Sequence, residues 1–199
     1  MQKKQNIILC IIFHFMLNIG YLTCGRTIES DEVLTPRYAV EPIVKYLKAR
    51  NYNAILCPFD KEDSQYVRVL TANGFYVSYS HLEKNFFTYT KEEILDFDCI
   101  VSNPPFSIKD KVLKKLYELE KPFMVLLPQN ALQSSTRTPL FIKYGLEYLG
   151  FDKRISFYTR GNLNKINMNN HFASGYFCHN VLPEKLIFET LQAVQEPYL

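Results

Sequence analysis

A short apolar run that ends at two adjacent prolines most constrains the fold of this chain. Residues 97–102 are mostly apolar, as in a buried strand, and the sequence Asn103-Pro104-Pro105-Phe106 follows directly. Proline cannot donate a backbone hydrogen bond or continue a central strand, so the chain must leave the sheet here as a stiff loop whose carbonyl oxygens stay free. The sequence therefore predicts hydrogen-bond acceptors at the end of a buried strand.

These acceptors suit an amino group. The Asn103 side-chain carbonyl and the Pro104 main-chain carbonyl are two acceptors within one short loop. Phe106 adds a flat apolar face for an aromatic ring. A planar amine meets both demands, and we predict such an amine as the group that this loop binds.

The segment resembles motif IV of the S-adenosylmethionine-dependent amino-methyltransferases, especially the phage-type adenine-specific DNA methyltransferases. That family carries Asp, Asn or Ser, then Pro-Pro and Tyr or Phe, after the fourth strand of a Rossmann-like sheet. The resemblance implies catalytic roles for Asn103, Pro104, Pro105 and Phe106. It also implies methyl transfer from S-adenosylmethionine to the exocyclic amino group of adenine in DNA, with the target base flipped out of the duplex.

The rest of the chain shows the pattern of a βαβ series. Apolar runs predict strands at 54–57, 75–79, 97–102 and 122–128. Helical periodicity predicts helices that start at a Thr35 cap and run over 63–72, 109–119 and 139–148. Strands over 155–158 and 174–178 would close the sheet. We expect an α/β, Rossmann-like methyltransferase fold, with a mostly parallel sheet, helices on both faces and an antiparallel closing strand.

Ligands of such sheets bind beyond the carboxyl ends of the strands, and the resemblance implies that S-adenosylmethionine lies there. Thr35-Pro36 resembles motif X, residues 58–60 stand at motif I, and Asn85-Phe86 resembles an Asp-Phe segment near the third strand. Ser80-His81 stands where a ribose-binding acid is usual. The implied cofactor contacts are Thr35, Pro36, Pro58, Phe59, Asp60, Ser80, His81, Asn85 and Phe86.

Two departures from the family pattern leave an alternative open. The first loop has Pro58-Phe59-Asp60 and no glycine, and no acid stands at Ser80-His81. A non-catalytic descendant that keeps the fold and binds nucleic acid would also have this sequence. The proline loop itself also resembles guanine-amino rRNA methyltransferases and the glutamine methyltransferases of release factors, so RNA or protein glutamine are alternative substrates.

A group of basic residues in the final third predicts contacts with nucleic acid, DNA in the first place and RNA as an alternative. The residues are Lys153, Arg154, Arg160 and Lys165. A polar hairpin loop at the sheet edge explains them equally well. The net charge of +3 is compatible with a nucleic-acid partner without requiring one. The sequence has no metal-ligand cluster, and we predict no metal.

The length of 199 residues suits one domain, which we place at 26–199 and expect to be a monomer. Residues 1–25 contain Lys3, Lys4 and an apolar run, so this segment resembles a signal peptide. We expect a cytoplasmic protein on which this segment is an appendage; secretion or membrane anchoring through residues 1–25 is the alternative. The five scattered cysteines, without a Cys-x-x-Cys pair, favour reduced core thiols and the cytoplasm.

Overall fold

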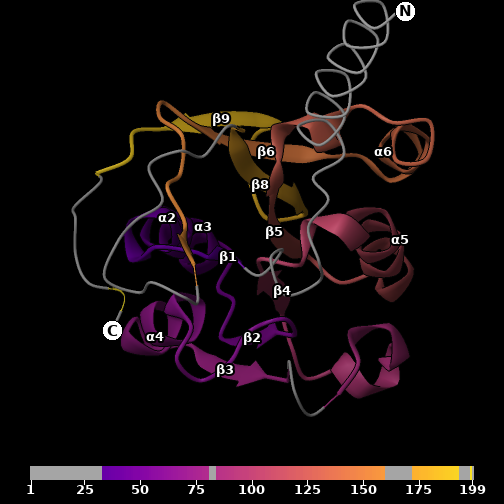
Figure 1. The fold of residues 1–199 in the computed structure, drawn as a ribbon. Helices are drawn as coiled ribbons and strands as arrows, with labels where there is room; N and C mark the ends of the chain where they lie inside the picture. The colour runs from indigo at the N-terminus through magenta and orange to yellow at the C-terminus, as the bar shows by residue number, and fades with distance from the viewer. Residues whose placement is uncertain (1–32, 81–83, 160–171, 193–197, 199) are drawn as a thin grey trace, which may run out of the picture. The chain divides into compact units, whose positions relative to one another are not determined.

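The computed structural model describes residues 33–80, 84–159, 172–192 and 198 (Figure 1). The predicted signal-like segment 1–25, His81, Arg160 and Lys165 lie outside these residues. Within them, no helix is long and apolar enough to cross a membrane.

A seven-stranded mixed sheet forms the centre of the fold, in the order β3-β2-β4-β5-β8-β6-β9. Strands β2, β3, β4 and β5 are parallel, β8 runs antiparallel to both of its neighbours, and β9 is parallel to β6. The strands are β2 (Ala54–Cys57), β3 (Tyr76–Tyr79), β4 (Cys99–Ser102), β5 (Phe123–Pro128), β6 (Glu147–Phe151), β8 (Ser174–His179) and β9 (Leu186–Glu189). This arrangement confirms the predicted α/β, Rossmann-like fold with a mostly parallel sheet and an antiparallel strand near its closing edge.

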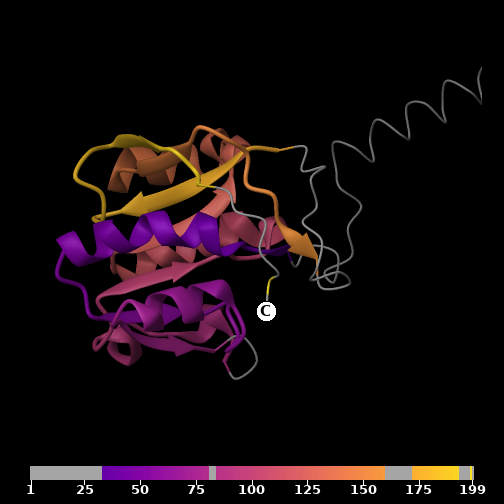
Figure 2. The same ribbon diagram turned by 90° about the vertical axis from the view of Figure 1, so that its left-hand side faces the viewer.

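Helices cover both faces of the sheet. Figure 1 shows α2 and α4 on one side and α5 and α6 on the other, and Figure 2 turns the first group toward the viewer. The α-helices are α2 (Arg37–Val40), α3 (Val44–Ala49), α4 (Gln65–Ala72), α5 (Lys109–Leu119) and α6 (Thr138–Tyr144). Short 3-10 helices are η2 (Glu41–Ile43), η3 (Phe86–Thr88), η4 (Glu92–Ile94), η5 (Phe106–Ile108) and η6 (Gln129–Leu132). The strands β4 and β5 are buried along their whole length, as their continuous apolar sequences predict.

The last third of the chain differs from the prediction. The helix expected over 139–148 ends at Tyr144, because Gly145 takes a positive φ of 82° and stops it. The residues after it form β6, which is the strand next to β8. The strand expected over 155–158 is reduced to β7 (Tyr158–Thr159), which pairs with β1 (Val33–Leu34) in a separate two-stranded sheet. Strand β9 had no counterpart in the prediction.

The predicted Thr35 cap is also wrong. The N-cap of α2 is Pro36, and no side chain caps this helix. Thr35 directly follows β1, and its hydroxyl is buried instead, beside the Tyr66 hydroxyl. By contrast, the predicted start of α4 is confirmed, because Ser64 Oγ accepts a hydrogen bond from the Val67 N–H at 3.3 Å.

Three cysteines lie in the sheet core. Cys57, Cys99 and Cys178 are buried, free thiols. Burial raises the pKa of each thiol well above its ordinary value, so all three stay protonated and unreactive. These residues have the role of core thiols that the sequence predicted for Cys57 and Cys99.

Candidate active site

Asn103 directly follows the carboxyl end of β4. The NH2 group of its side-chain amide is hydrogen-bonded, whereas its carbonyl oxygen accepts no hydrogen bond from a described residue. Its Nδ2 donates to the Val33 carbonyl at 3.1 Å. Its Oδ1 is buried and has no hydrogen-bond partner in the described part of the chain. Because the Val33 carbonyl can only accept, this bond fixes which way the amide points. The free acceptor is therefore held in one orientation.

The two prolines extend the same loop. Pro104 is buried, and none of the described residues donates to its carbonyl. The Pro105 carbonyl accepts from the Ile108 N–H at 3.2 Å, which starts η5. Two acceptors, Asn103 Oδ1 and the Pro104 carbonyl, thus stay available on neighbouring residues, as the proline pair predicts.

Phe106 lies in a more covered position than the sequence suggested. Its side chain is only 8% exposed. The rings of Phe157 and Phe172 meet it edge to face, with centroids 6.2 Å and 5.6 Å away. Phe106 is therefore part of an aromatic cluster beside the loop, and little of its ring is open to a ligand.

Ser102 ties the loop after β4 to the loop after β2. Its hydroxyl donates to the Asp60 carboxylate and accepts from the Phe59 N–H at 3.3 Å. Sequence reasoning missed Ser102. The signal was its place as the last residue of a buried strand, because the ends of the neighbouring parallel strands β2 and β4 must meet.

Asp60 is a buried acid at this junction. Burial raises its pKa from 3.8 to about 7, although hydrogen bonds from Ser102 and Ser64 act in the opposite direction. Its own N–H donates to the Cys57 carbonyl at 3.2 Å. The first loop thus uses the N–H groups of Phe59 and Asp60 within the protein, where a glycine-rich loop would offer such groups to a ligand.

Three further residues implied as cofactor contacts, Ser80, Asn85 and Phe86, make contacts within the protein. Ser80 Oγ accepts from the Tyr89 hydroxyl at 2.9 Å, and both residues are buried. Asn85 Oδ1 accepts from the Phe87 N–H at 3.0 Å and so caps η3. Phe86 packs its ring on Phe59, with centroids 4.9 Å apart. These side chains have structural roles in the protein as it stands.

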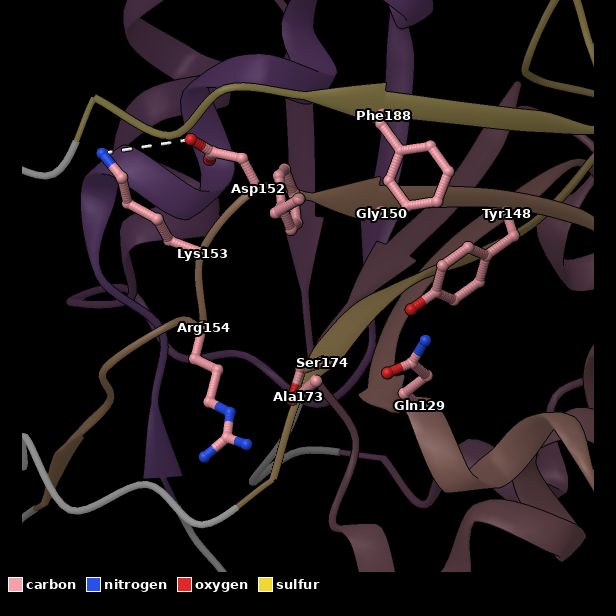
Figure 3. Close-up of a pocket in the computed structure, with 10 residues that line it drawn as sticks. Gln129, Tyr148, Gly150, Asp152, Lys153, Arg154, Ala173, Ser174 and Phe188 are labelled. Carbon is pink, nitrogen blue, oxygen red and sulfur yellow. Dashed lines mark ion pairs between the residues drawn. The ribbon is translucent and has the colours of Figure 1, made fainter.

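Lys153 and Arg154 lie elsewhere on the same edge of the sheet, directly after β6. Both are exposed, and both line a pocket of about 190 Å³ (Figure 3). Lys153 Nζ is 4.0 Å from an Asp152 carboxylate oxygen. The sheet order places β5 and β8 between β4 and β6, so these cations are separate from the Asn103 loop. No group of metal-ligating side chains occurs among the described residues.

Comparisons with known proteins match the fold without defining a family. No family model and no curated protein matches the chain. One similar solved structure is a protein from Agrobacterium tumefaciens predicted to be an O-methyltransferase, with 10% identity, a TM-score of 0.34, and coverage of 69% of this chain and 66% of the other. Another is a protein from Listeria monocytogenes proposed to be a class I S-adenosylmethionine-dependent methyltransferase, with 11% identity, a TM-score of 0.44, and coverage of 92% and 73%.

This chain thus spans slightly less than two thirds of the Agrobacterium protein. Both TM-scores are below 0.5, so the fold rests on the strand order of the sheet itself.

Proposed function

We propose that this protein transfers a methyl group from S-adenosylmethionine to the exocyclic amino group of adenine in DNA. The observation that carries the proposal is the buried Oδ1 of Asn103 beside the carbonyl of Pro104, neither of which accepts a hydrogen bond from a described residue. A buried acceptor without a partner costs free energy in the unbound protein, about 1–3 kcal/mol, and a donor from a ligand would recover it. An amino group brings two donors.

The geometry suggests how the loop would activate that amine. When bound, S-adenosylmethionine supplies an electrophilic methyl group on sulfur. Asn103 Oδ1 and the Pro104 carbonyl each accept one amine hydrogen, which turns the nitrogen lone pair out of the ring plane and toward the methyl group. Both acceptors also stabilise the positive charge that develops on the nitrogen. The amine then loses one proton to water, so no general base is required.

The residues near the first loop fit one end of the cofactor. The Thr35 hydroxyl is buried beside the Tyr66 hydroxyl, and Asp60 holds a carboxyl group whose pKa of about 7 allows it to ionise beside a cation. We propose that Thr35, Pro36 and residues 58–60 hold the amino-acid part of S-adenosylmethionine. Ser80 and Asn85 would have to exchange an internal hydrogen bond for one to the cofactor.

An adenine inside a duplex cannot reach this loop, so the base would have to flip out. The covered position of Phe106 means that the aromatic cluster with Phe157 and Phe172 would have to open for the base to stack on it. The same two acceptors also suit a guanine amino group in RNA or a glutamine side-chain amide. These remain alternative substrates of the same chemistry.

A second candidate function is a non-catalytic nucleic-acid-binding protein with a methyltransferase fold. It is favoured by the internal hydrogen bonds of the first loop, of Ser80 and of Asn85, which leave few groups free for a cofactor. Calorimetric titration of the folded protein with S-adenosylmethionine separates the two. Heat of binding with one site per chain supports the enzyme, and its absence supports the second function.

The decisive experiment is transfer of a tritiated methyl group to unmethylated DNA, RNA and protein in parallel. Incorporation into adenine of DNA by the wild-type protein, lost in Asn103→Ala, is the expected result. Incorporation into RNA or protein alone would move the function to an alternative substrate. Equal incorporation by Asn103→Ala would exclude the loop as the active site.

A further inference from the structure

We infer that the pocket between β6, β8 and β9 binds one nucleotide of the substrate strand, with its base on an aromatic wall and its phosphate on Arg154. This inference rests on the proposed function, because it supplies that enzyme with a second contact on nucleic acid. The pocket is lined by Gln129, Tyr148, Gly150, Phe151, Asp152, Lys153, Arg154, Ala173, Ser174 and Phe188.

A buried hydroxyl without a partner marks the pocket as a binding site. Ser174 is only 4% exposed, and its Oγ has no hydrogen-bond partner among the residues that the structure describes. Ser174 is the first residue of β8 and pairs with Pro128 at the end of β5. Since buried polar groups are normally hydrogen-bonded, this hydroxyl indicates a ligand that donates to it or accepts from it.

Gly150 lines the pocket without a side chain. A Cβ atom at Gly150 would lie 2.6 Å from the Phe188 ring, and one at Gly175, in the neighbouring strand β8, would lie 2.3 Å from the Tyr148 hydroxyl. The aromatic rings therefore lie directly on backbone. Figure 3 shows Tyr148 and Phe188 side by side along one wall, next to Gly150. Phe188 is 66% exposed, so its ring is open to stacking with a base.

The opposite side of the pocket carries the charge for a phosphate. The guanidinium of Arg154 lies on the same side as Ser174 in Figure 3, whereas Lys153 extends toward Asp152. Arg154 has no ion-pair partner in the described part of the chain. A planar guanidinium that is free in this way binds phosphate well. With Lys153 and Asp152 counted, the pocket has a net charge of +1.

The volume of the pocket and its place at the edge of the sheet favour a nucleotide that is part of a strand over a free small molecule. The volume of about 190 Å³ is below the range of about 300–1,000 Å³ typical of sites for drug-sized molecules, so the pocket suits a part of a larger molecule. Strands β5 and β8 lie between β4 and β6, which separates the ends of β4 and β6 by about 14 Å. Along a DNA strand that is about four nucleotides at about 3.4 Å each. A strand with its target base at Asn103 therefore has another base near this pocket.

Binding of a short, adenine-rich, fluorescently labelled single-stranded DNA tests the inference by anisotropy over a range of salt concentrations. We expect Phe188→Ala to weaken binding about tenfold. We expect Arg154→Gln to weaken it and to lower the slope of log affinity against log salt by about one. Leu186→Ala, an exposed apolar change on the same strand, and Lys114→Gln, a charge change on α5, should bind like the wild type.

Ser174→Ala separates a binding role from a structural one. Because the hydroxyl has no partner among the described residues, its removal should leave the melting temperature unchanged or higher while DNA binding weakens. A lower melting temperature with unchanged binding would mean that Ser174 serves the fold. The same titrations with free adenosine monophosphate show whether the pocket binds a nucleotide of a strand or a free nucleotide. If the monophosphate binds as tightly as the strand, and its binding depends on Phe188, the inference is overturned.

The binding experiments and the methyl-transfer experiment can fail independently of each other. Methyl transfer to DNA by the wild type, combined with DNA binding that Phe188→Ala and Arg154→Gln leave unchanged, would refute the pocket and keep the enzyme. DNA binding that depends on both residues, without methyl transfer to any substrate, would refute the enzyme and keep the pocket.

Discussion

The loop after β4 and the loop after β2 end neighbouring parallel strands, yet they use their hydrogen-bonding groups in opposite ways. After β4, Asn103 and Pro104 carry two acceptors to which no residue in the described part of the chain donates. After β2, Phe59 and Asp60 bond to Ser102 and Cys57. Polar groups left free in a folded protein indicate a ligand, whereas bonded ones hold the scaffold. The proposed substrate side of this site therefore has acceptors available for a ligand, and the proposed cofactor side, after β2, is closed by internal hydrogen bonds.

Asn103→Ala should give the largest effect, because it removes the free acceptor itself. We expect turnover to fall by about 100- to 1,000-fold, as when one stabilising group is lost from a transition state. Cofactor affinity should not change. Turnover is measured by tritiated methyl transfer and affinity by calorimetry. Asn85→Ala is the matched control, since its amide oxygen is already bonded to the Phe87 N–H. A similar loss of turnover in Asn85→Ala would break the distinction between the two sides.

Glu147→Ala tests how much stability is lost when a carboxylate that already accepts three hydrogen bonds is removed. The buried Glu147 carboxylate accepts from the backbone N–H groups of Asn180, Val181 and Leu182, at 3.1, 2.9 and 2.8 Å. We expect the free energy of unfolding to fall by about 3 kcal/mol or more, because three buried donors lose their partner. Asn103→Ala, which breaks only the bond to Val33, should cost about 1 kcal/mol.

Urea denaturation measures these changes in unfolding free energy. Glu118→Ala is the control for loss of a carboxylate, since its exposed pair with Lys114 should contribute less than about 1 kcal/mol. Equal losses of stability in Glu147→Ala and Asn103→Ala would contradict the comparison.

Asp60→Asn tests the loop after β2 through the pH dependence of the free energy of unfolding. The unfolded chain releases the Asp60 proton near its ordinary pKa of 3.8, whereas the folded protein keeps it until about pH 7. Between these values the native state binds more protons than the unfolded one, so this group lowers stability as pH rises, by at most about 1.4 kcal/mol per pH unit. The contribution is present in full below pH 3.8 and lost above pH 7.

Asp60→Asn should remove this decline. Relative to the wild type, the variant should therefore gain stability between pH 5 and pH 7 in urea denaturation. A difference between the two proteins that does not change with pH would mean that Asp60 titrates normally and is open to solvent or ligand.

Ser80→Ala should give the smallest effect. It leaves the buried Tyr89 hydroxyl without its acceptor, which should lower the free energy of unfolding by about 1 kcal/mol. The affinity for S-adenosylmethionine should stay the same, because Ser80 is already bonded within the protein. A clear loss of affinity in calorimetry would show that Ser80 changes partners and contacts the cofactor.

Much of the fold could be predicted from local sequence. The strands β2, β4 and β5 are continuous apolar runs, and proline or a polar loop follows each. The C-terminal part could not be predicted as well, because Leu146, Tyr148 and Leu149 also fit the apolar face of a helix. The stop at Gly145 was visible in the sequence as a glycine after a helical pattern. The pairing of β1 with β7 depends on segments more than a hundred residues apart.

The candidate site was predictable on one side only. Asn103 and Pro104 follow from the chemistry of two prolines after a strand. Whether Ser80 or Asn85 is free depends on which hydrogen-bond donor lies nearby in three dimensions, and a residue type does not reveal that. Lys153 and Arg154 were identified by charge, but their companions Ser174 and Phe188 were not, since a buried serine and an exposed aromatic ring look ordinary in a sequence.

The position of β8 also dictates the order in which the sheet can be completed during synthesis. β6 pairs only with β8 and β9, and β8 is made after it. Until residue 179 leaves the ribosome, β6 has no neighbour in the sheet and one edge of β5 is bare. An unpaired edge of buried, apolar sequence promotes association with other chains. The nascent protein should therefore depend on chaperones most while residues 151–179 are being made.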